Sequence, residues 1–155
     1  MKQLLADQDL SAAIHTIFEQ RIPFNKYLGL RVVSVDPRQP VIRVGMRDEL
    51  VGNFVQGGLH GGVTSAILDV TGGLVAFLNV TEKLVELTDE EKLHRFAKLG
   101  TIDLRVDYLR PGRGDHFLAR GFILRTGNKV AVTRMELHND ADQLIAVGTG
   151  AYTVS

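Results

Sequence analysis

The chain has 155 residues, a length that suits one domain with a substantial buried core. Its 18 basic and 18 acidic residues cancel, and no basic run stands out, so neither nucleic acid nor anionic lipid is expected as the main partner. Because cysteine is absent, the composition excludes a disulfide framework, a thiolate nucleophile and a cysteine-based zinc site.

The whole chain, residues 1–155, is predicted to be a single domain, because no internal repeat, low-complexity tract or linker divides it. The first residues lack the long apolar stretch and small-residue cleavage site of a secretory signal. We therefore expect a cytoplasmic protein whose partner is a small molecule or another copy of the chain.

Residues 1–22 are expected to form a short amphipathic helix on the surface of the core. Apolar side chains recur there at helical spacing: Leu10, Ile14, Ile17 and Phe18. Residues 30–35 and 41–47 are predicted to be strands, and the second of them alternates in polarity. Pro37 and Pro40 mark a turn between the two segments, so together they predict a hairpin.

The most apolar segment, residues 63–80, is predicted to be a long helix. It is about long enough to cross a bilayer. However, it carries Asp69 and two glycines near its centre and lacks the flanking aromatic and basic residues that usually mark a membrane span. We therefore expect a helix that is enclosed by protein.

Residues 81–99 are predicted to be an extended helical connection. Thr88 and Glu91 have the spacing of a capping box, which indicates that a second short helix begins there. The remaining sequence alternates in polarity over four stretches, at 101–108, 116–125, 129–138 and 144–153. The turns between them are too short for crossover helices, so they predict an antiparallel meander. The fold class is α+β, with an antiparallel sheet wrapped around one long central helix.

One face of the long helix is expected to be open around Asp69. On a helical wheel, the residues that lie within two turns of Asp69 and within about 60° of it are all small: Gly62, Ser65, Ala66, Gly72, Gly73 and Ala76. We therefore expect that nothing bulky shields the carboxylate. The opposite half is bulky and apolar, and it is expected to pack on the concave side of the sheet.

Two features of this helix favour a functional site over a structural one. An ionised carboxylate in an apolar setting is costly unless it is paired, hydrogen-bonded or partly wet, although a structural aspartate that pairs with arginine would satisfy the same pattern. The Gly72-Gly73 pair costs up to about 1 kcal/mol per glycine relative to alanine in a helix. The pair therefore indicates a close approach by a ligand or a partner subunit.

A glycine-rich segment, Asn53-Phe-Val-Gln-Gly-Gly-Leu-His60-Gly61-Gly62, leads into the helix. Glycines at a helix start leave backbone amides unshielded, and the helix dipole adds partial positive charge there, an arrangement that suits an oxyanion. A tight loop with His60 as a plain cap residue is the structural alternative.

Taken together, Asn53, His60-Gly61-Gly62 and Asp69 resemble the PaaI-like acyl-CoA thioesterases of the hotdog superfamily. The resemblance continues through the paired glycines and into the stretch from Thr101 to Pro111, and it spans roughly residues 24–153. Residues 81–98 are similar to the longer connection of bacterial members that act on medium or long acyl chains, where such a segment could cover the acyl end of the site. The resemblance implies a hotdog fold in which a sheet curls around one helix.

The resemblance also implies roles for individual residues. Asp69 would be the general base or nucleophile, and the Gly61 amide, beside His60, would donate to the oxyanion. Thr101 would be the hydroxyl beside Asp69. Asn53 would position water or substrate, but its interval to His60 is one residue longer than the common pattern, so Gln56 is the alternative. Further residues are expected to contact substrate: Gly62, Ser65, Gly72, Gly73 and Arg110.

The family assembles as dimers or tetramers with each active site between subunits, so a homo-oligomer is expected here. Neither a metal nor a cofactor is expected beyond the coenzyme A of the substrate, since the histidines show no ligand spacing. Two alternatives to hydrolysis remain open: a hotdog acyl-thioester hydratase or dehydratase, and a non-catalytic acyl-thioester sensor.

Overall fold

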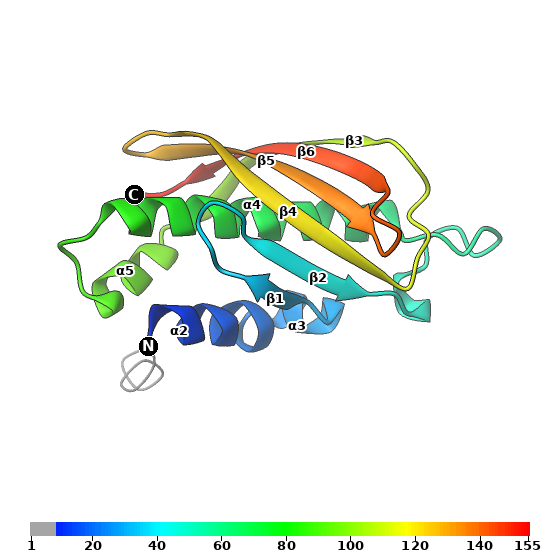
Figure 1. Cartoon of the computed structure of the whole chain (residues 1–155), viewed down its shortest axis with the longest axis horizontal. Coiled ribbons are helices and arrows are strands. Elements are labelled where there is room, and N and C mark those ends of the chain that lie inside the picture. Colours follow the sequence, from blue (N-terminus) through cyan, green and yellow to red (C-terminus); the bar gives the residue numbers. More distant parts are fainter. Residues whose placement is uncertain (1–8) are drawn as a thin grey trace.

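The computed structural model describes residues 9–155 and packs a six-stranded antiparallel sheet against one long helix (Figure 1). The helical elements are α2 (Leu10–Thr16), the π-helix η1 (Ile17–Arg21), α3 (Pro23–Leu28), the 3-10 helix η2 (Asp48–Leu50), α4 (Gly61–Lys83) and α5 (Asp89–Phe96). The strands are β1 (Arg31–Ser34), β2 (Val41–Gly45), β3 (Gly100–Tyr108), β4 (His116–Thr126), β5 (Val130–Asn139) and β6 (Leu144–Thr153).

The strand order of the sheet corrects one prediction. The order is β1-β2-β4-β5-β6-β3, and every recorded pairing is antiparallel. The predicted β1-β2 hairpin is confirmed, and β4, β5 and β6 form a meander. The predicted four-strand meander is wrong, because β3 pairs with β6 at the far edge and β2 takes the place beside β4. Residues 109–115 form a connection long enough to cross the end of the sheet.

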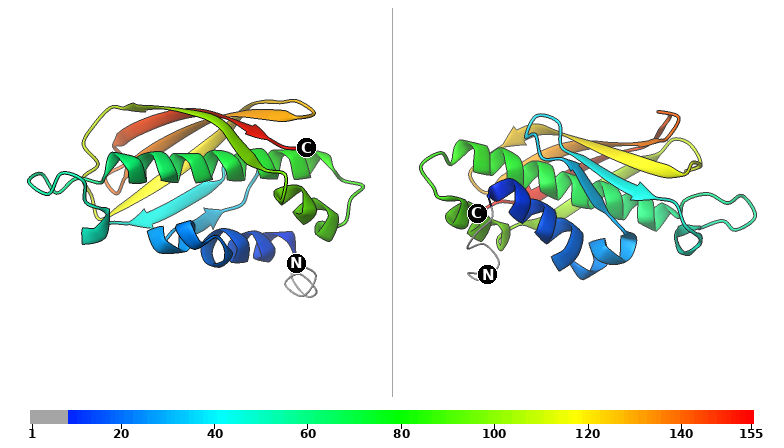
Figure 2. Two further views of the ribbon diagram at one scale, coloured as in Figure 1. Left: turned by 180° about the vertical axis from the view of Figure 1, so that it is seen from behind. Right: turned by 60° about the horizontal axis from the view of Figure 1, so that its bottom comes forward.

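Helix α4 contains the predicted apolar helix and runs along the concave side of the sheet (Figures 1 and 2). It packs on β2, β3, β4, β5 and β6. The helix packs closely on Gly121 of β4, where an added Cβ would lie 2.2 Å from a methyl of Val75. Of the residues described, 9–155, only this helix is long and apolar enough to span a membrane, and 61% of its most apolar window is buried within the protein.

The N-terminal segment is built differently from the single predicted helix. Residues 1–8 of the predicted span lie outside the described part. Beyond them, α2 is followed by the π-helix η1 and by a further helix, α3, which was not predicted. Pro23 starts α3 with a preset backbone angle, and Gly29 ends it in the left-handed conformation at φ 68°. These elements lie along α4 on the side away from β4, β5 and β6 (Figure 2).

Glu19 fastens η1 to the edge of the sheet. Its carboxylate accepts hydrogen bonds from Arg31 Nη1 and from the Val32 amide, both at 2.8 Å. Burial by itself would raise the pKa of Glu19, but these two hydrogen bonds and one from His15 outweigh burial and lower the pKa.

Helix α5 begins where the sequence predicted. Thr88 Oγ1 accepts from the Glu91 amide, and the Glu91 carboxylate accepts from the Thr88 amide, so the capping box is formed. Three phenylalanines join the helices edge to face: the ring centroids of Phe18 and Phe96 are 5.5 Å apart, and those of Phe77 and Phe96 are 5.8 Å apart. Through this aromatic cluster, η1, α5 and α4 pack against one another.

Candidate active site

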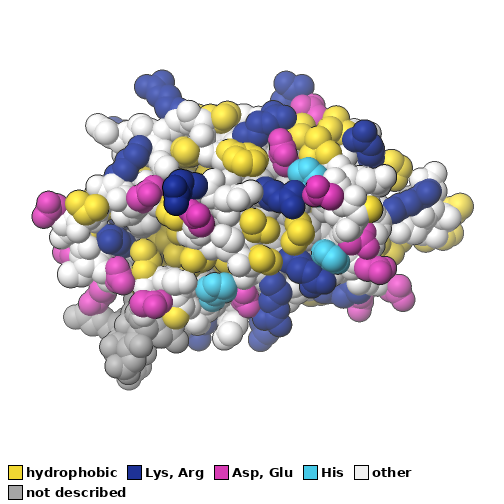
Figure 3. All heavy atoms as spheres, viewed as in Figure 1, with side chains coloured by type: hydrophobic (Ala, Val, Ile, Leu, Met, Phe, Trp, Pro, Cys, Tyr) yellow, Lys and Arg dark blue, Asp and Glu magenta, His cyan; other side chains and the backbone are white. Residues whose placement is uncertain are grey.

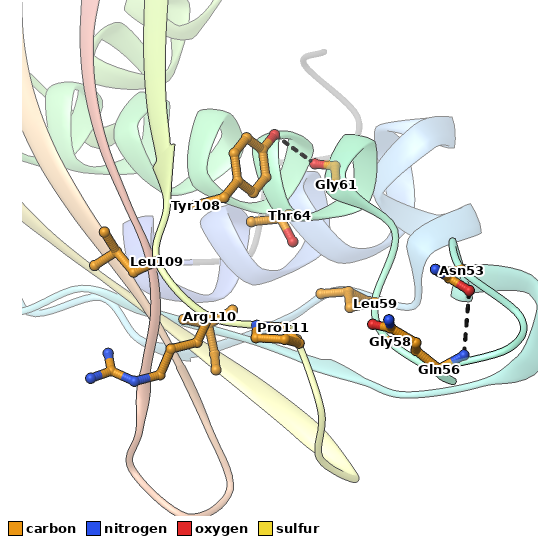
Figure 4. A pocket seen from close by; sticks show the side chains of 12 residues that line it. Asn53, Gln56, Gly58, Leu59, Gly61, Thr64, Tyr108, Leu109, Arg110 and Pro111 are labelled. Carbon is orange, nitrogen blue, oxygen red and sulfur yellow. Dashed lines mark hydrogen bonds between the residues drawn. The ribbon is translucent and has the colours of Figure 1, made fainter.

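A first pocket of about 420 Å³ lies at the N-terminal end of α4 (Figure 4). Its lining comes from the loop before α4 and from the end of β3 with the turn that follows, and it includes Asn53, Gln56, Gly61, Tyr108 and Arg110. On the face of the molecule that Figure 3 shows, charged side chains of both signs are interspersed, and apolar side chains gather at the projecting loop. At the tip of that loop Phe54 is 88% exposed and Val55 is 79% exposed.

The start of α4 holds an unused backbone donor. His60 is the N-cap residue, and its Nδ1 accepts from the Gly62 amide at 2.8 Å, as in the capping alternative. The Gly61 carbonyl accepts from the Tyr108 hydroxyl at 2.9 Å. Among residues 9–155 the Gly61 amide has no recorded acceptor. A free amide at the positive end of a helix of 23 residues is suited to stabilise an oxyanion.

Asn53 and Gln56 both line this pocket. Asn53 Oδ1 is engaged in its own loop, since it accepts from the amides of Val55 at 3.1 Å and Gln56 at 3.3 Å (Figure 4). The side-chain amide nitrogen of Asn53 is therefore the group left to donate to a ligand. Since both residues face the same pocket, Asn53 and Gln56 both stay candidates for positioning water.

Asp69 is held by two hydroxyl groups from distant strands. Thr101 Oγ1 donates to Asp69 Oδ1 at 2.9 Å. The Tyr152 hydroxyl lies 3.2 Å from the same oxygen and 3.1 Å from the Asp69 carbonyl. Within the described part of the chain Oδ2 accepts no recorded hydrogen bond. One oxygen of the carboxylate is thus anchored, and the other is available to a water molecule or a substrate.

Tyr152 is a donor and not a base. Its side chain is 1% exposed. Burial raises the pKa of the Tyr152 hydroxyl far above its ordinary value, and the charge of Asp69 and the hydrogen bond to it raise the pKa further. The hydroxyl therefore keeps its proton over the physiological range and fixes the orientation of the carboxylate.

A second pocket, of about 260 Å³, opens beside Asp69 and Thr101. Its walls are largely apolar and come from η1, α3, α4 and the end of the α5 connection: Phe18, Ile22, Phe24, Val70, Phe96 and Leu99. The last residues of the predicted helical connection, Phe96 and Leu99, line this pocket. The pocket combines an anchored carboxylate with an apolar interior, which is the usual composition of a small-molecule site.

The two pockets are separate within one chain. Gly61 and Asp69 are eight residues apart on α4, which places them about 12 Å apart along the helix axis. An oxyanion donor and a base for one carbonyl must both lie within hydrogen-bond reach of it. The site thus has two halves in each chain: the Asp69 half, at the second pocket, and the Gly61 half, at the first pocket. Strand β3 contacts both halves, because Thr101 near its start reaches Asp69 and Tyr108 at its end reaches Gly61.

Two expectations for the small face of α4 are corrected. Asp69 is shielded by a bulky side chain, since Tyr152 of β6 lies over it. The close approach at Gly72 comes from the same tyrosine and not from a ligand or a partner: an added Cβ would lie 2.2 Å from the Tyr152 hydroxyl. Gly73 differs, because its Cβ would make only ordinary contacts, at 3.6 Å and 3.9 Å, and it lines the second pocket.

The remaining predicted residues lie near the first pocket. Ser65 Oγ donates to the carbonyls of Gly61 and Gly62 in the preceding helical turn. Gly62 is exposed and donates to His60. Arg110 lines the first pocket, and its Nη1 donates to the Leu144 carbonyl at 2.9 Å.

Sequence reasoning missed Tyr152, Tyr108 and the N-terminal wall of the second pocket. Each tyrosine sits at a regular strand position, and alternation alone gives it no distinction from a core residue. Phe18 was noted only as part of an amphipathic helix. The only available signal was the combination of Gly72 with an aromatic residue far along the chain, and a single sequence does not reveal such a pairing.

Comparison with known proteins gives concordant matches. A family model described as "Thioesterase superfamily" matches residues 56–146. The protein named "Medium/long-chain acyl-CoA thioesterase YigI" from Salmonella typhimurium is 40% identical over 154 residues, which cover 99% of each chain.

Two solved structures extend the comparison. A crystal structure from Shewanella oneidensis, of a protein related to the thioesterase superfamily, is 46% identical, has a TM-score of 0.89 and covers 93% of this chain and 94% of its own. The phenylacetic acid degradation protein PaaI from Thermus thermophilus, 24% identical, matches in fold with a TM-score of 0.67 and covers 86% of this chain and 99% of its own.

Proposed function

Because the chain belongs to the thioesterase superfamily and has the hotdog fold, we propose that it hydrolyses acyl-CoA thioesters to a free acid and coenzyme A. The relatives that match over 99% of both chains are named for medium- and long-chain acyl-CoA, which supports a substrate of that length. The observation that carries the proposal is the half-anchored Asp69 carboxylate at the mouth of an apolar pocket.

The active site is proposed to form between two copies of the chain. The outer edge of β3 pairs with no strand among residues 9–155, although β3 is nine residues long. A long open edge favours pairing with another strand. If two β3 strands pair antiparallel about a two-fold axis near Leu104 and Arg105, Thr101 of one chain lies opposite Tyr108 of the other. The Asp69 half then meets the Gly61 half of the partner subunit.

In the proposed reaction the thioester carbonyl lies between these halves. The free oxygen of Asp69 accepts a proton from water as the water oxygen attacks the carbonyl carbon. The Gly61 amide of the partner subunit donates to the oxyanion, and the tetrahedral intermediate collapses with loss of the coenzyme A thiolate, which takes up the proton held by Asp69. Asn53 or Gln56 orients the water. In the alternative route the Asp69 carboxylate attacks the carbonyl carbon first and the C–S bond breaks with loss of the coenzyme A thiolate; water then hydrolyses the mixed anhydride to the free acid and the Asp69 carboxylate. Both routes use side chains, one amide and water, without a cofactor.

The primary test is release of free thiol from a series of acyl-CoA substrates by wild type and by Asp69→Asn. This substitution keeps the shape of the side chain and removes the base. We expect kcat to fall by about 10²-fold or more, the usual contribution of a positioned base. Thermal unfolding serves as the folding control. A variant that is folded and retains wild-type kcat would contradict the assignment of Asp69.

A complementation experiment tests the shared site. Asp69→Asn and Gly61→Pro each disable one half, so each homodimer is inactive in the proposal. After the two variants are unfolded and refolded together, half of the dimers are mixed and each has one intact site, so about a quarter of wild-type activity should return. If both halves acted within one chain, mixing would restore nothing.

Two other outcomes correspond to the alternative functions. Tight binding of acyl-CoA by folded wild type without thiol release would indicate a sensor. Consumption of an enoyl-CoA with gain of water and an intact thioester would indicate a hydratase.

A further inference from the structure

We propose that the pocket between the N-terminal helices and α5 holds the acyl chain of the substrate and sets the chain length that the enzyme prefers. The inference rests on the proposed function and assigns a role to residues outside the catalytic group. The pocket opens directly at Asp69 and Thr101. A thioester whose carbonyl meets Asp69 therefore has its acyl group at the mouth of this pocket.

The lining suits a saturated hydrocarbon chain. Phe18, Phe24 and Phe96 together with three aliphatic side chains form the walls. Apart from Asn25, which is 1% exposed and donates to the Phe18 carbonyl, the polar side chains of the lining stand at the Asp69 end. Asp69, Thr101 and Tyr152 gather at that end and bond to one another. The polarity of the pocket thus runs in the same direction as that of a fatty acyl thioester.

Packed aromatic rings support one wall of the pocket, where Phe18 and Phe96 line it. Phe18 and Phe77 are each 3% exposed, and both rings meet Phe96 edge to face. Such a wall is rigid, because core side chains are close-packed and resist displacement. An acyl chain that meets this wall can extend no further toward it.

Gly73 leaves space in this pocket, because it has no side chain to fill it. It lies one helical turn from Asp69 and lines the pocket. Unlike Gly72, it has no close neighbour that requires a glycine, since an added Cβ would lie 3.6 Å from Leu99 and 3.9 Å from Tyr152. A glycine in a helix is less favourable than alanine, and space for a ligand accounts for the presence of glycine at this position.

The test is the chain-length profile of kcat/KM for straight-chain acyl-CoAs from butanoyl to palmitoyl, measured on the full chain. In wild type, kcat/KM should rise about fourfold for each methylene that enters the pocket and then level off. In Gly73→Leu the added side chain fills the pocket, so the rise should stop two or three methylenes earlier, and the longest substrates should lose about tenfold or more relative to butanoyl-CoA.

Two further variants keep the test decisive. Phe24 is 55% exposed, so Phe24→Ala should fold normally and reduce kcat/KM several-fold for long chains only. Gly45→Leu is the matched control, because a Cβ at Gly45 meets nothing within 4 Å and Gly45 lines neither pocket. Its chain-length profile should equal that of wild type. Folding of each variant is checked by thermal unfolding.

The outcomes separate this inference from the proposed function. If wild type hydrolyses acyl-CoA and both pocket variants fold with an unchanged profile, the inference is overturned and the proposed function stands. If wild type hydrolyses nothing, binding of non-hydrolysable acyl-CoA thioethers is measured instead. If the affinity of wild type rises with acyl-chain length and the affinity of Gly73→Leu does not, the pocket binds the acyl chain although the hydrolase proposal fails. Affinity independent of chain length overturns both.

Discussion

Gly61→Pro removes the proposed oxyanion donor while leaving the fold nearly undisturbed. Gly61 is the first residue of α4, a position where proline is favoured because its missing N–H has no helical acceptor. The preceding residue must be extended, and His60 already is, with φ −62° and ψ 135°. An added Cβ at Gly61 would lie 3.5 Å from Tyr108 Cε1, an ordinary contact. Proline is therefore compatible with the backbone and with its surroundings.

The expected effect follows from what the amide does in the proposed reaction. Loss of one oxyanion donor costs about 3–4 kcal/mol in the transition state, or about 10²- to 10³-fold in kcat. Since the amide has no recorded acceptor among residues 9–155, its loss should leave the free energy of unfolding almost unchanged. Gly61→Ala is the matched variant: it adds the same Cβ and keeps the N–H.

The assay is steady-state acyl-CoA hydrolysis by the two variants, with urea unfolding of both. The ratio of kcat between Gly61→Ala and Gly61→Pro isolates the amide from the added bulk. A folded Gly61→Pro enzyme with kcat within a few-fold of the alanine variant would refute the assignment of this amide, and the donor would have to be sought elsewhere in the first pocket.

Three further predictions concern the support of Asp69 and the N-terminal segment. Tyr152→Phe removes a hydrogen bond to a charged group, so kcat for acyl-CoA hydrolysis should fall about ten- to hundredfold with KM little changed; an unchanged kcat would show that the hydroxyl has no positioning role. Thermal unfolding of Gly72→Ala should show a free energy of unfolding that is lower by about 1–3 kcal/mol, because the added Cβ meets the Tyr152 hydroxyl. In Gly73→Ala the free energy of unfolding should be unchanged or higher by up to about 1 kcal/mol. Equal changes in the two variants would contradict the packing described. Glu19→Gln should lower the free energy of unfolding in urea at neutral pH, where the stabilisation from the ionised Glu19 carboxylate is fully present. The difference from wild type should disappear as the pH falls from 4.5, the ordinary pKa, through the lowered pKa of Glu19. A difference that stays constant with pH would refute this linkage.

Several elements followed from the sequence because the interactions that define them are local. The long helix is visible in the apolar run of 63–80, and its ends extend to Gly61 and Lys83. The capping box at Thr88 joins groups three residues apart, so spacing alone predicts it. The strands from His116 to Thr153 follow from alternation interrupted by turn residues. The motif resemblance added the fold family and the pairing of Thr101 with Asp69, which the residue pattern by itself did not contain.

The sequence by itself thus determined most of the elements, including the helix that carries Asp69, and the family. The tertiary structure decided which distant residues meet. Tyr152 reaches Asp69 across 83 positions, β3 joins β6 and not β4, and Phe18 meets Phe96 in the wall of the second pocket. Such contacts depend on how the sheet curls around α4 and on which edge each strand takes. Periodicity reports only which face of an element is buried, so it leaves the choice of neighbour to long-range packing.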